Sequence, residues 1–86
     1  MKADQVLKHP LATEKAVRLM ERENKLLFAV DLKAKKEEIK KAVETVFDVK
    51  VEGVTTFITT RGEKRAYVKL SATHPAIDVM TRLGLM

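Results

Sequence analysis

The sequence contains no cysteine and no tryptophan, and it has only two prolines and three glycines. Without cysteine the chain can form neither a disulfide bond nor a thiolate metal site. No apolar run approaches the roughly 20 residues that a membrane-spanning helix needs, and the first residues lack the pattern of a signal peptide. We therefore expect a soluble intracellular protein that is not inserted in a membrane and that carries no metal or other cofactor.

Acidic residues are in the minority. The chain has 17 Lys and Arg residues and 12 Asp and Glu residues, which gives a net charge of +5. Residues 21–48 are balanced in charge, so the basic surplus lies in residues 1–20 and 49–70. This surplus favours an anionic partner such as a nucleic acid. With 86 residues, 45% of them hydrophobic, the chain is expected to form a single domain, residues 1–86, around one core.

The clearest helix of the chain lies in residues 33–48. Its apolar positions follow helical spacing and share one face: Ile39, Ala42, Val43, Val46 and Phe47. The pattern then changes to the alternation of a strand in residues 49–52. A helix with one apolar face that leads directly into a strand is expected to lie on a sheet. We predict that Val43 and Phe47 lie in the core against Val30 or Val68.

The other segments add strands and helices on both sides of this unit. Residues 5–8 read as a short strand or extended lead-in that stops at His9-Pro10, because proline cannot continue a central strand. A helix is predicted from the N-cap Thr13 to Asn24, followed by a buried strand in residues 25–31. Residues 54–60 and 64–70 read as a hairpin around the tight turn at Arg61-Gly62, with a bulge at Gly53.

A last helix is predicted after His74-Pro75, with Ile77, Met80 and Leu83 facing inward and Gly84 at its end. The expected order is therefore β-α-β-α-β-β-α. This order predicts an α+β fold in which helices pack on an antiparallel sheet, as in a ferredoxin-like or ribosomal α/β plait.

No set of residues in the sequence is typical of an active site, so the chain is not expected to be an enzyme. His9 and His74 both precede proline in predicted loops, and without a nearby acidic cluster a role in shaping turns is favoured over metal binding. An acylphosphatase-like enzyme would need a phosphate-binding glycine loop and a catalytic asparagine. The one asparagine, Asn24, is placed at a helix end with no such loop beside it.

The predicted hairpin is the most informative set of residues. Arg65, Tyr67 and Lys69 share one face of the second strand. If the bulge is at Gly53, one face of the first strand carries Thr55, Phe57 and Thr59. If these two faces coincide, the sheet presents hydroxyls, aromatic rings and cations that suit phosphates, riboses and bases. In the alternative interpretation, one residue of slip turns Phe57 inward under the last helix.

Three blocks of the sequence together resemble a known family. They are Val6–Ala16 with its Pro10 and Thr13-Glu14-Lys15-Ala16, the segment Ile39–Val51, and the hairpin strands Val54–Thr56 and Arg65–Leu70. Their order and spacing are similar to those of large-subunit ribosomal protein twenty-three. The short turn at residues 60–64 and the lack of a basic N-terminal extension resemble the archaeal form.

This resemblance implies a ribosomal protein that binds the third domain of the large-subunit rRNA at the rim of the polypeptide exit tunnel. It also implies neighbouring ribosomal proteins as partners, and a docking surface for nascent-chain factors such as the signal recognition particle; no homo-oligomer is expected. Glu14 is the residue that we expect at the docking surface. From the resemblance and the basic surplus, the expected rRNA-binding residues are Lys8, Thr13, Lys15, Lys36, Lys40, Thr55, Thr56, Arg61, Lys64, Arg65 and Tyr67.

Two other binding modules remain open at this point. A ferredoxin-like domain that senses a small molecule could share the β-α-β alternation, although its hairpin would have no use for the basic residues. An RNA-recognition motif is the other, but only fragments of its consensus occur around residues 65–70, with few aromatic residues.

Overall fold

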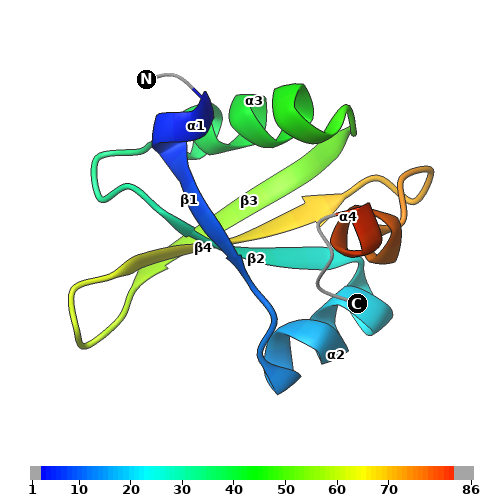
Figure 1. The fold of residues 1–86 in the computed structure, drawn as a ribbon, viewed down its shortest axis with the longest axis horizontal. Helices are drawn as coiled ribbons and strands as arrows, with labels where there is room; N and C mark the ends of the chain where they lie inside the picture. The colour runs from blue at the N-terminus through cyan, green and yellow to red at the C-terminus, as the bar shows by residue number, and fades with distance from the viewer. Residues whose placement is uncertain (1–2, 83–86) are drawn as a thin grey trace.

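A computed structural model describes residues 3–82 of the chain as a four-stranded sheet with helices (Figure 1). The elements in chain order are α1 (Ala3–Val6), β1 (Leu7–Leu11), α2 (Glu14–Glu23), β2 (Lys25–Val30), α3 (Lys36–Phe47), β3 (Val51–Ile58), β4 (Lys64–Leu70) and α4 (Ala76–Arg82). The predicted order β-α-β-α-β-β-α is confirmed, and the single-turn helix α1 precedes it unexpectedly. The α+β class with an antiparallel sheet is also confirmed.

The strands lie in the order β1-β2-β4-β3, and every neighbouring pair is antiparallel. The hairpin register places Thr55 opposite Tyr67 and Phe57 opposite Arg65. The register shifts between Val51 and Gly53, which confirms the predicted bulge. In Figure 1 the β3–β4 turn lies at the left of the sheet and α4 at the right, so the two ends of β4 have different surroundings.

Strand β1 departs from the expectation that the first strand stops at His9-Pro10. It continues to Leu11, with Pro10 opposite Phe28 of β2. Proline is tolerated here because β1 is an edge strand, and a missing N–H on the solvent side of an edge breaks no hydrogen bond of the sheet. The register of β1 also shifts between Leu7 and His9, which leaves Lys8 in an irregular stretch.

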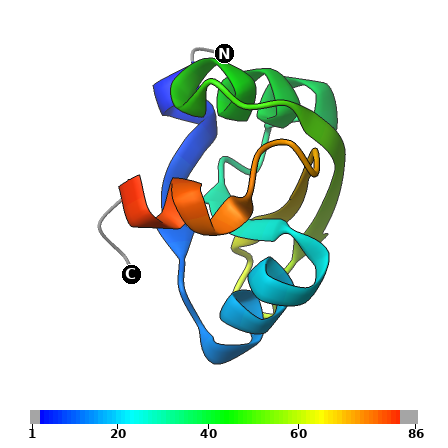
Figure 2. The same cartoon turned by 90° about the vertical axis from the view of Figure 1, so that its right-hand side faces the viewer.

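The core lies between one face of the sheet and helix α3, which runs above the strands in Figure 2. Val43 of α3 is completely buried in one cluster with Val30 and Val68, as predicted. The buried residues of this cluster from the other helices are Val6, Met20, Ala76, Val79 and Met80. Every helix of the described chain therefore contributes to the same core.

Two apolar side chains that were expected in the core are exposed instead. Val46 is 52% exposed and Ile77 is 45% exposed. In α4 the buried positions are Ala76, Val79 and Met80, and a residue one position after Ala76 is turned about 100° away from that face. In the last turn of α3, Val46 lies beside the edge strand β1 and is left uncovered by residues 3–82.

Phe47 is half-buried rather than fully enclosed. Its ring stacks on that of Phe28 with a centroid distance of 5.7 Å. The ring therefore packs against the core cluster that contains Val30 and Val68, as predicted, and its stacking on Phe28 is an additional contact. Leu83 and Gly84, which were expected to complete the last helix, lie outside the described residues.

Asn24 joins the end of α2 to the start of α4. It adopts a left-handed conformation, with φ 55°, as the C-cap of α2. Its side-chain Nδ2 lies within 3.1–3.2 Å of the carbonyl oxygens of Leu70, Ser71 and His74. Its Oδ1 accepts a hydrogen bond of 2.6 Å from the N–H of Ala76. Because both ends of the amide are occupied by backbone groups, Asn24 has a structural role, and the acylphosphatase-like interpretation loses its candidate residue.

Helix α3 begins at Lys36 without the Ser, Thr or Asp cap that marks many helix starts. Instead, Oε1 of Glu38 accepts a hydrogen bond of 3.2 Å from the backbone N–H of Lys35, which is the reciprocal half of a capping box. This hydrogen bond is the main reason that the pKa of Glu38 lies below its usual value.

Candidate nucleic-acid interface

The strands β3 and β4 present a mixed aromatic and basic surface on the side of the sheet away from α3. We call this surface the open face and define it by Thr55, Phe57, Arg65, Tyr67 and Lys69. The register brings these residues to the same side, because Thr55 lies opposite Tyr67 and Phe57 opposite Arg65. This decides between the two alternatives for Phe57, which faces outward with Tyr67 and not under the last helix.

The aromatic rings of the open face form a pair. The centroids of Phe57 and Tyr67 lie 5.3 Å apart, and the ring planes differ by 25°. Both side chains are half-buried, whereas Thr55 and Lys69 are exposed. Offset stacking of this kind stabilises a cross-strand pair and holds both rings in place on the sheet.

The same side of the sheet differs over β1 and β2. There Leu27 and Ala29 are 5% and 0% exposed, and both lie outside the core cluster. Helix α2 lies below the strands in Figure 2, on the side opposite α3, and its Ala16 is buried outside that cluster as well. The accessible part of this side is therefore the open face over β3 and β4.

Arg65 is held by an acidic residue at the end of the hairpin turn. Its Nε donates to Oε1 of Glu63 at 2.7 Å, and the two side chains are 33% and 36% exposed. The hydrogen bond from Arg65 is the main cause that lowers the pKa of Glu63, and the charges of Arg65, His9 and Lys8 lower it further. Lys8 and His9 of β1 thus belong to the electrostatic surroundings of this turn.

The turn itself is compact and exposed. Gly62 has φ +82°, a conformation that favours glycine. Its N–H donates to the carbonyl of Thr59 at 2.9 Å, and the N–H of Thr59 donates to the carbonyl of Glu63 at 2.8 Å. Arg61 projects from this turn as an exposed side chain, so its guanidinium is available to an anionic partner.

Two of the expected hairpin residues lie on the other side of the sheet. Thr56 is opposite Ala66, and Lys64 is opposite both Val30 and Ile58, all on the core-facing side. Nζ of Lys64 donates to the carbonyl oxygen of Ala34 at 2.7 Å. Because strand residues alternate between the two faces, neither Thr56 nor Lys64 is brought together with Arg65 and Tyr67.

Comparison with known proteins adds what the geometry alone does not give. A sequence profile of the family described as Ribosomal protein L23 matches residues 5–77. The chain belongs to the ribosomal protein L23 family. The chain is also similar to the large ribosomal subunit protein uL23 of the archaeon Pyrobaculum aerophilum, with 49% identity over 81 residues. That alignment covers 94% of this chain and 100% of the relative.

In this member of the L23 family, the opening of α2 is built by local contacts. Oγ1 of Thr13 accepts a hydrogen bond of 3.2 Å from the N–H of Ala16, so the predicted N-cap is confirmed. Glu14 forms an exposed ion pair with Arg18 at 2.9 Å, and its side chain is 83% exposed. Lys15 is exposed beside them. Glu14 is therefore accessible, and its ion pair with Arg18 is a contact that the sequence analysis did not predict.

The two α3 lysines of the candidate site form a second surface. Lys36 and Lys40 are exposed, and α3 covers the core-facing side of the sheet. They therefore do not share a surface with the open face. A single flat nucleic-acid contact cannot include both groups, so an RNA that reaches both has to wrap around the domain.

An apolar hollow of about 220 Å³ lies between β1 and the end of α3. Exposed Val46 and half-buried Phe47 form one wall, Phe28 lies against it, and Lys8 and His9 stand on the β1 side. The sequence pattern assigned Val46 to the core and so missed this hollow. The signal that could have found it is the proline in β1, which marks an edge strand next to the helix.

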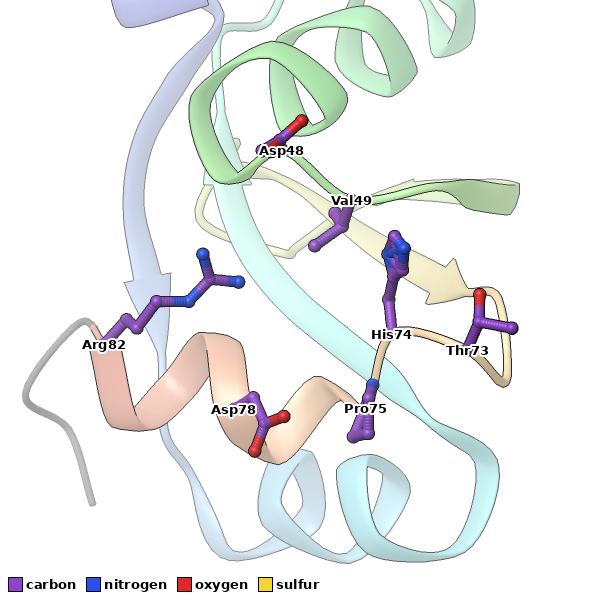
Figure 3. Close-up of a pocket in the computed structure, with 7 residues that line it drawn as sticks. All are labelled: Asp48, Val49, Thr73, His74, Pro75, Asp78 and Arg82. Carbon is purple, nitrogen blue, oxygen red and sulfur yellow. The ribbon is translucent and has the colours of Figure 1, made fainter.

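A second hollow, of about 250 Å³, lies between the residues that follow α3 and helix α4 with the loop before it (Figure 3). Its lining residues are Asp48, Val49, Thr73, His74, Pro75, Asp78 and Arg82. Nδ1 of His74 accepts a hydrogen bond from the N–H of Lys50 at 3.3 Å, and Arg82 donates to the carbonyl of Phe47 at 3.2 Å. The hydrogen bond from Lys50 supports the structural role expected of His74. Within residues 3–82, no three His, Cys, Asp or Glu residues are grouped so that they could hold a metal ion, and no helix there is long and apolar enough to cross a membrane.

Proposed function

We propose that this chain is a structural, non-enzymatic constituent of the large ribosomal subunit, acting in the cytoplasm. It binds the third domain of the large-subunit rRNA at the rim of the polypeptide exit tunnel. Membership of the L23 family supports this proposal, as does the full-length alignment with an archaeal large-subunit protein. The observation on this chain that carries it is the open face, where two stacked rings lie among cations and a hydroxyl.

The phosphate contacts come first from exposed cations near this face and the hairpin turn. Arg61 is exposed in the turn, and Lys8 stands in the irregular stretch of β1. Each contact between a cation and a phosphate releases counterions from the RNA, which favours binding. Lys15 of α2 extends the contacts along the opening segment, and Lys36 and Lys40 of α3 contact a different stretch of rRNA.

Lys64 and Thr56 contribute less directly to rRNA binding. The ammonium group of Lys64 is already hydrogen-bonded to Ala34, so it stabilises the hairpin base and adds its charge at longer range. Thr56 faces the core side, and Thr13 uses its hydroxyl oxygen as a helix cap. Thr55 is the exposed threonine of the open face, where its hydroxyl can meet a ribose or a phosphate.

A docking surface for nascent-chain factors, such as the signal recognition particle, is the second part of the proposal. Two features support it: the exposed carboxylate of Glu14 and the apolar hollow lined by Val46 and Phe47. A partner segment that carries an apolar side chain can fill the hollow, which buries surface that residues 3–82 leave open. Neighbouring ribosomal proteins bind the remaining surface, and no homo-oligomer is needed.

Co-sedimentation in sucrose gradients at high salt tests this proposal. Tagged protein, expressed in cells or added to subunits that lack it, should migrate with large subunits and not with small ones. High salt removes proteins bound only by diffuse charge. Protein that stays at the top of the gradient at every salt concentration would contradict a role as a structural constituent.

A further inference from the structure

The stacked rings of the open face leave apolar surface uncovered, and phosphate binding alone gives this surface no partner. Phe57 and Tyr67 lie side by side on neighbouring strands with their ring centroids 5.3 Å apart, and each ring is only partly buried. Apolar rings left at a surface cost free energy unless a partner covers them. No aromatic ring among residues 3–82 stacks on the outer side of this pair.

We propose that the open face binds unpaired RNA nucleotides, with a base stacked against the Phe57–Tyr67 pair. This inference rests on the proposed function and specifies which form of RNA the face takes. A base has a flat π-face of the same kind as the two rings, and stacking on aromatic side chains is a common way to hold single-stranded RNA.

Double-stranded RNA does not fit this face equally well. In a duplex the bases are already stacked on one another and present only their edges in the grooves. The open face lies within two paired strands, and its residues are regular strand positions without a projecting loop or helix. A duplex would therefore meet the cations of the face and leave the rings uncovered, whereas an unpaired base covers them.

The cations around the pair are placed to hold the backbone of such a nucleotide. Arg65 lies opposite Phe57, and Lys69 is two residues along β4 from Tyr67. Glu63 engages Nε of Arg65, so the terminal amino groups of Arg65 can donate to a phosphate. Thr55, opposite Tyr67, adds an exposed hydroxyl that can pair with a ribose 2′-OH.

An acidic protein segment is the competing occupant of a basic, aromatic face. Two observations favour RNA. The chain belongs to a family of ribosomal proteins, and two flat rings stacked on each other match a base better than they match the irregular side chains of a peptide. A binding experiment that compares RNA with an acidic peptide decides between the two.

Tyr67 provides a direct signal, because the chain contains one tyrosine and no tryptophan. Its intrinsic fluorescence therefore reports on the open face alone, and a base stacked against the ring quenches it. We expect a mixed-sequence single-stranded RNA of about 10 nucleotides to quench this fluorescence. A hairpin duplex of equal charge should quench it much less. Equal quenching by the two RNAs, no quenching by the single strand, or stronger quenching by an acidic peptide would overturn the proposal.

The variant Phe57→Leu removes the stacking surface and keeps the charge. It should weaken binding of the single strand by roughly 5- to 100-fold, as expected when one stacked base loses its ring, with an unchanged dependence on salt. The matched control is Ile58→Leu at the next position of β3, which is 63% exposed and faces the other side of the sheet; its affinity should equal that of the parent. An unchanged affinity of Phe57→Leu would overturn the proposal.

The experiments distinguish a failure of the stacking inference from a failure of the proposed function in rRNA binding. If Phe57→Leu binds the third domain of the rRNA as well as the parent does, while removal of the hairpin cations weakens that binding, the stacking inference fails and the proposed function stands. If neither the parent nor any variant binds the rRNA, the proposed function itself fails.

Discussion

Oδ1 of Asn24 accepts a hydrogen bond of 2.6 Å from the backbone N–H of Ala76, a residue 52 positions further along the chain. Through this contact the end of α2 fixes the start of α4. The same side chain donates to the carbonyl groups of Leu70 at the end of β4 and of Ser71 and His74 after it. Asn24 therefore stabilises the end of the sheet opposite the hairpin. The hairpin end of the sheet remains accessible for binding.

The first prediction concerns this contact. Asn24→Gly keeps the left-handed backbone without strain but removes all of the side-chain hydrogen bonds. We expect a loss of about 2–3 kcal/mol in the free energy of unfolding, since several partly buried backbone groups lose their partner. Urea unfolding followed by circular dichroism measures it. A loss below about 0.5 kcal/mol, the size of an ordinary surface substitution, would show that the contact does not stabilise the fold.

The second prediction concerns the end of α3. Phe47→Ala should cost about 2 kcal/mol, below the 3–5 kcal/mol of a fully buried phenylalanine, because the ring is only half-buried. Val46→Ala, one residue away, is the matched control and should change the free energy of unfolding by less than about 0.5 kcal/mol, since its side chain is mostly exposed. Equal losses for the two variants in urea unfolding would contradict the placement of Phe47 against Phe28.

Most of the fold was predictable because apolar periodicity is strong in β4 and α3. Strand β4 has the predicted limits, Lys64 and Leu70, and Val43 occupies the predicted core. Prediction fails where the apolar pattern of one segment does not reveal where that segment lies in the sheet. Whether Pro10 ends a strand depends on whether that strand is at an edge, and this depends on the whole sheet.

The candidate site was predictable only in part for the same reason. Alternation grouped Arg65 with Tyr67, but the bulge at Gly53 decides whether Phe57 joins them, and its exact position is set by pairing with β4. The hydrogen bonds of Lys64 to Ala34 and of Arg65 to Glu63 depend on side-chain geometry across the fold. No spacing in the sequence indicates them.

The third prediction concerns the pKa of Glu63, which Arg65 lowers below the usual 4.5. A carboxyl group with a lowered pKa in the folded state contributes stability above its unfolded pKa and loses it as the pH falls through the folded value. The contribution of Glu63 is therefore complete at neutral pH and is lost below about pH 4.5. In Arg65→Gln the pKa of Glu63 should rise toward 4.5, which a carbon-detected NMR titration of its carboxyl group measures. An unchanged pKa would show that Arg65 does not hold the carboxylate in solution.

The fourth prediction concerns factor docking at Glu14. Ribosomes that carry Glu14→Gln should bind the signal recognition particle more weakly, although the protein folds and assembles normally. The simpler explanation for this acid is its favourable position at the start of α2, worth about 0.3–1 kcal/mol, together with its ion pair to Arg18. Arg18→Gln is the matched control, since it breaks the same ion pair and leaves the carboxylate. If both variants bind the factor as the parent does, Glu14 only stabilises the helix.

The central claim is that cations at the hairpin end of the sheet bind the phosphates of the large-subunit rRNA. Its most direct test is the salt dependence of binding to the third rRNA domain, compared between two triple variants with equal charge. In Lys8→Gln, Arg61→Gln, Arg65→Gln we expect weaker binding and a shallower plot of log affinity against log salt, by roughly 0.7–0.9 for each phosphate that the variant no longer binds. The control Arg22→Gln, Lys41→Gln, Lys50→Gln removes three exposed cations elsewhere and should keep nearly the parental slope. The same slope for the parent and both variants would contradict this claim.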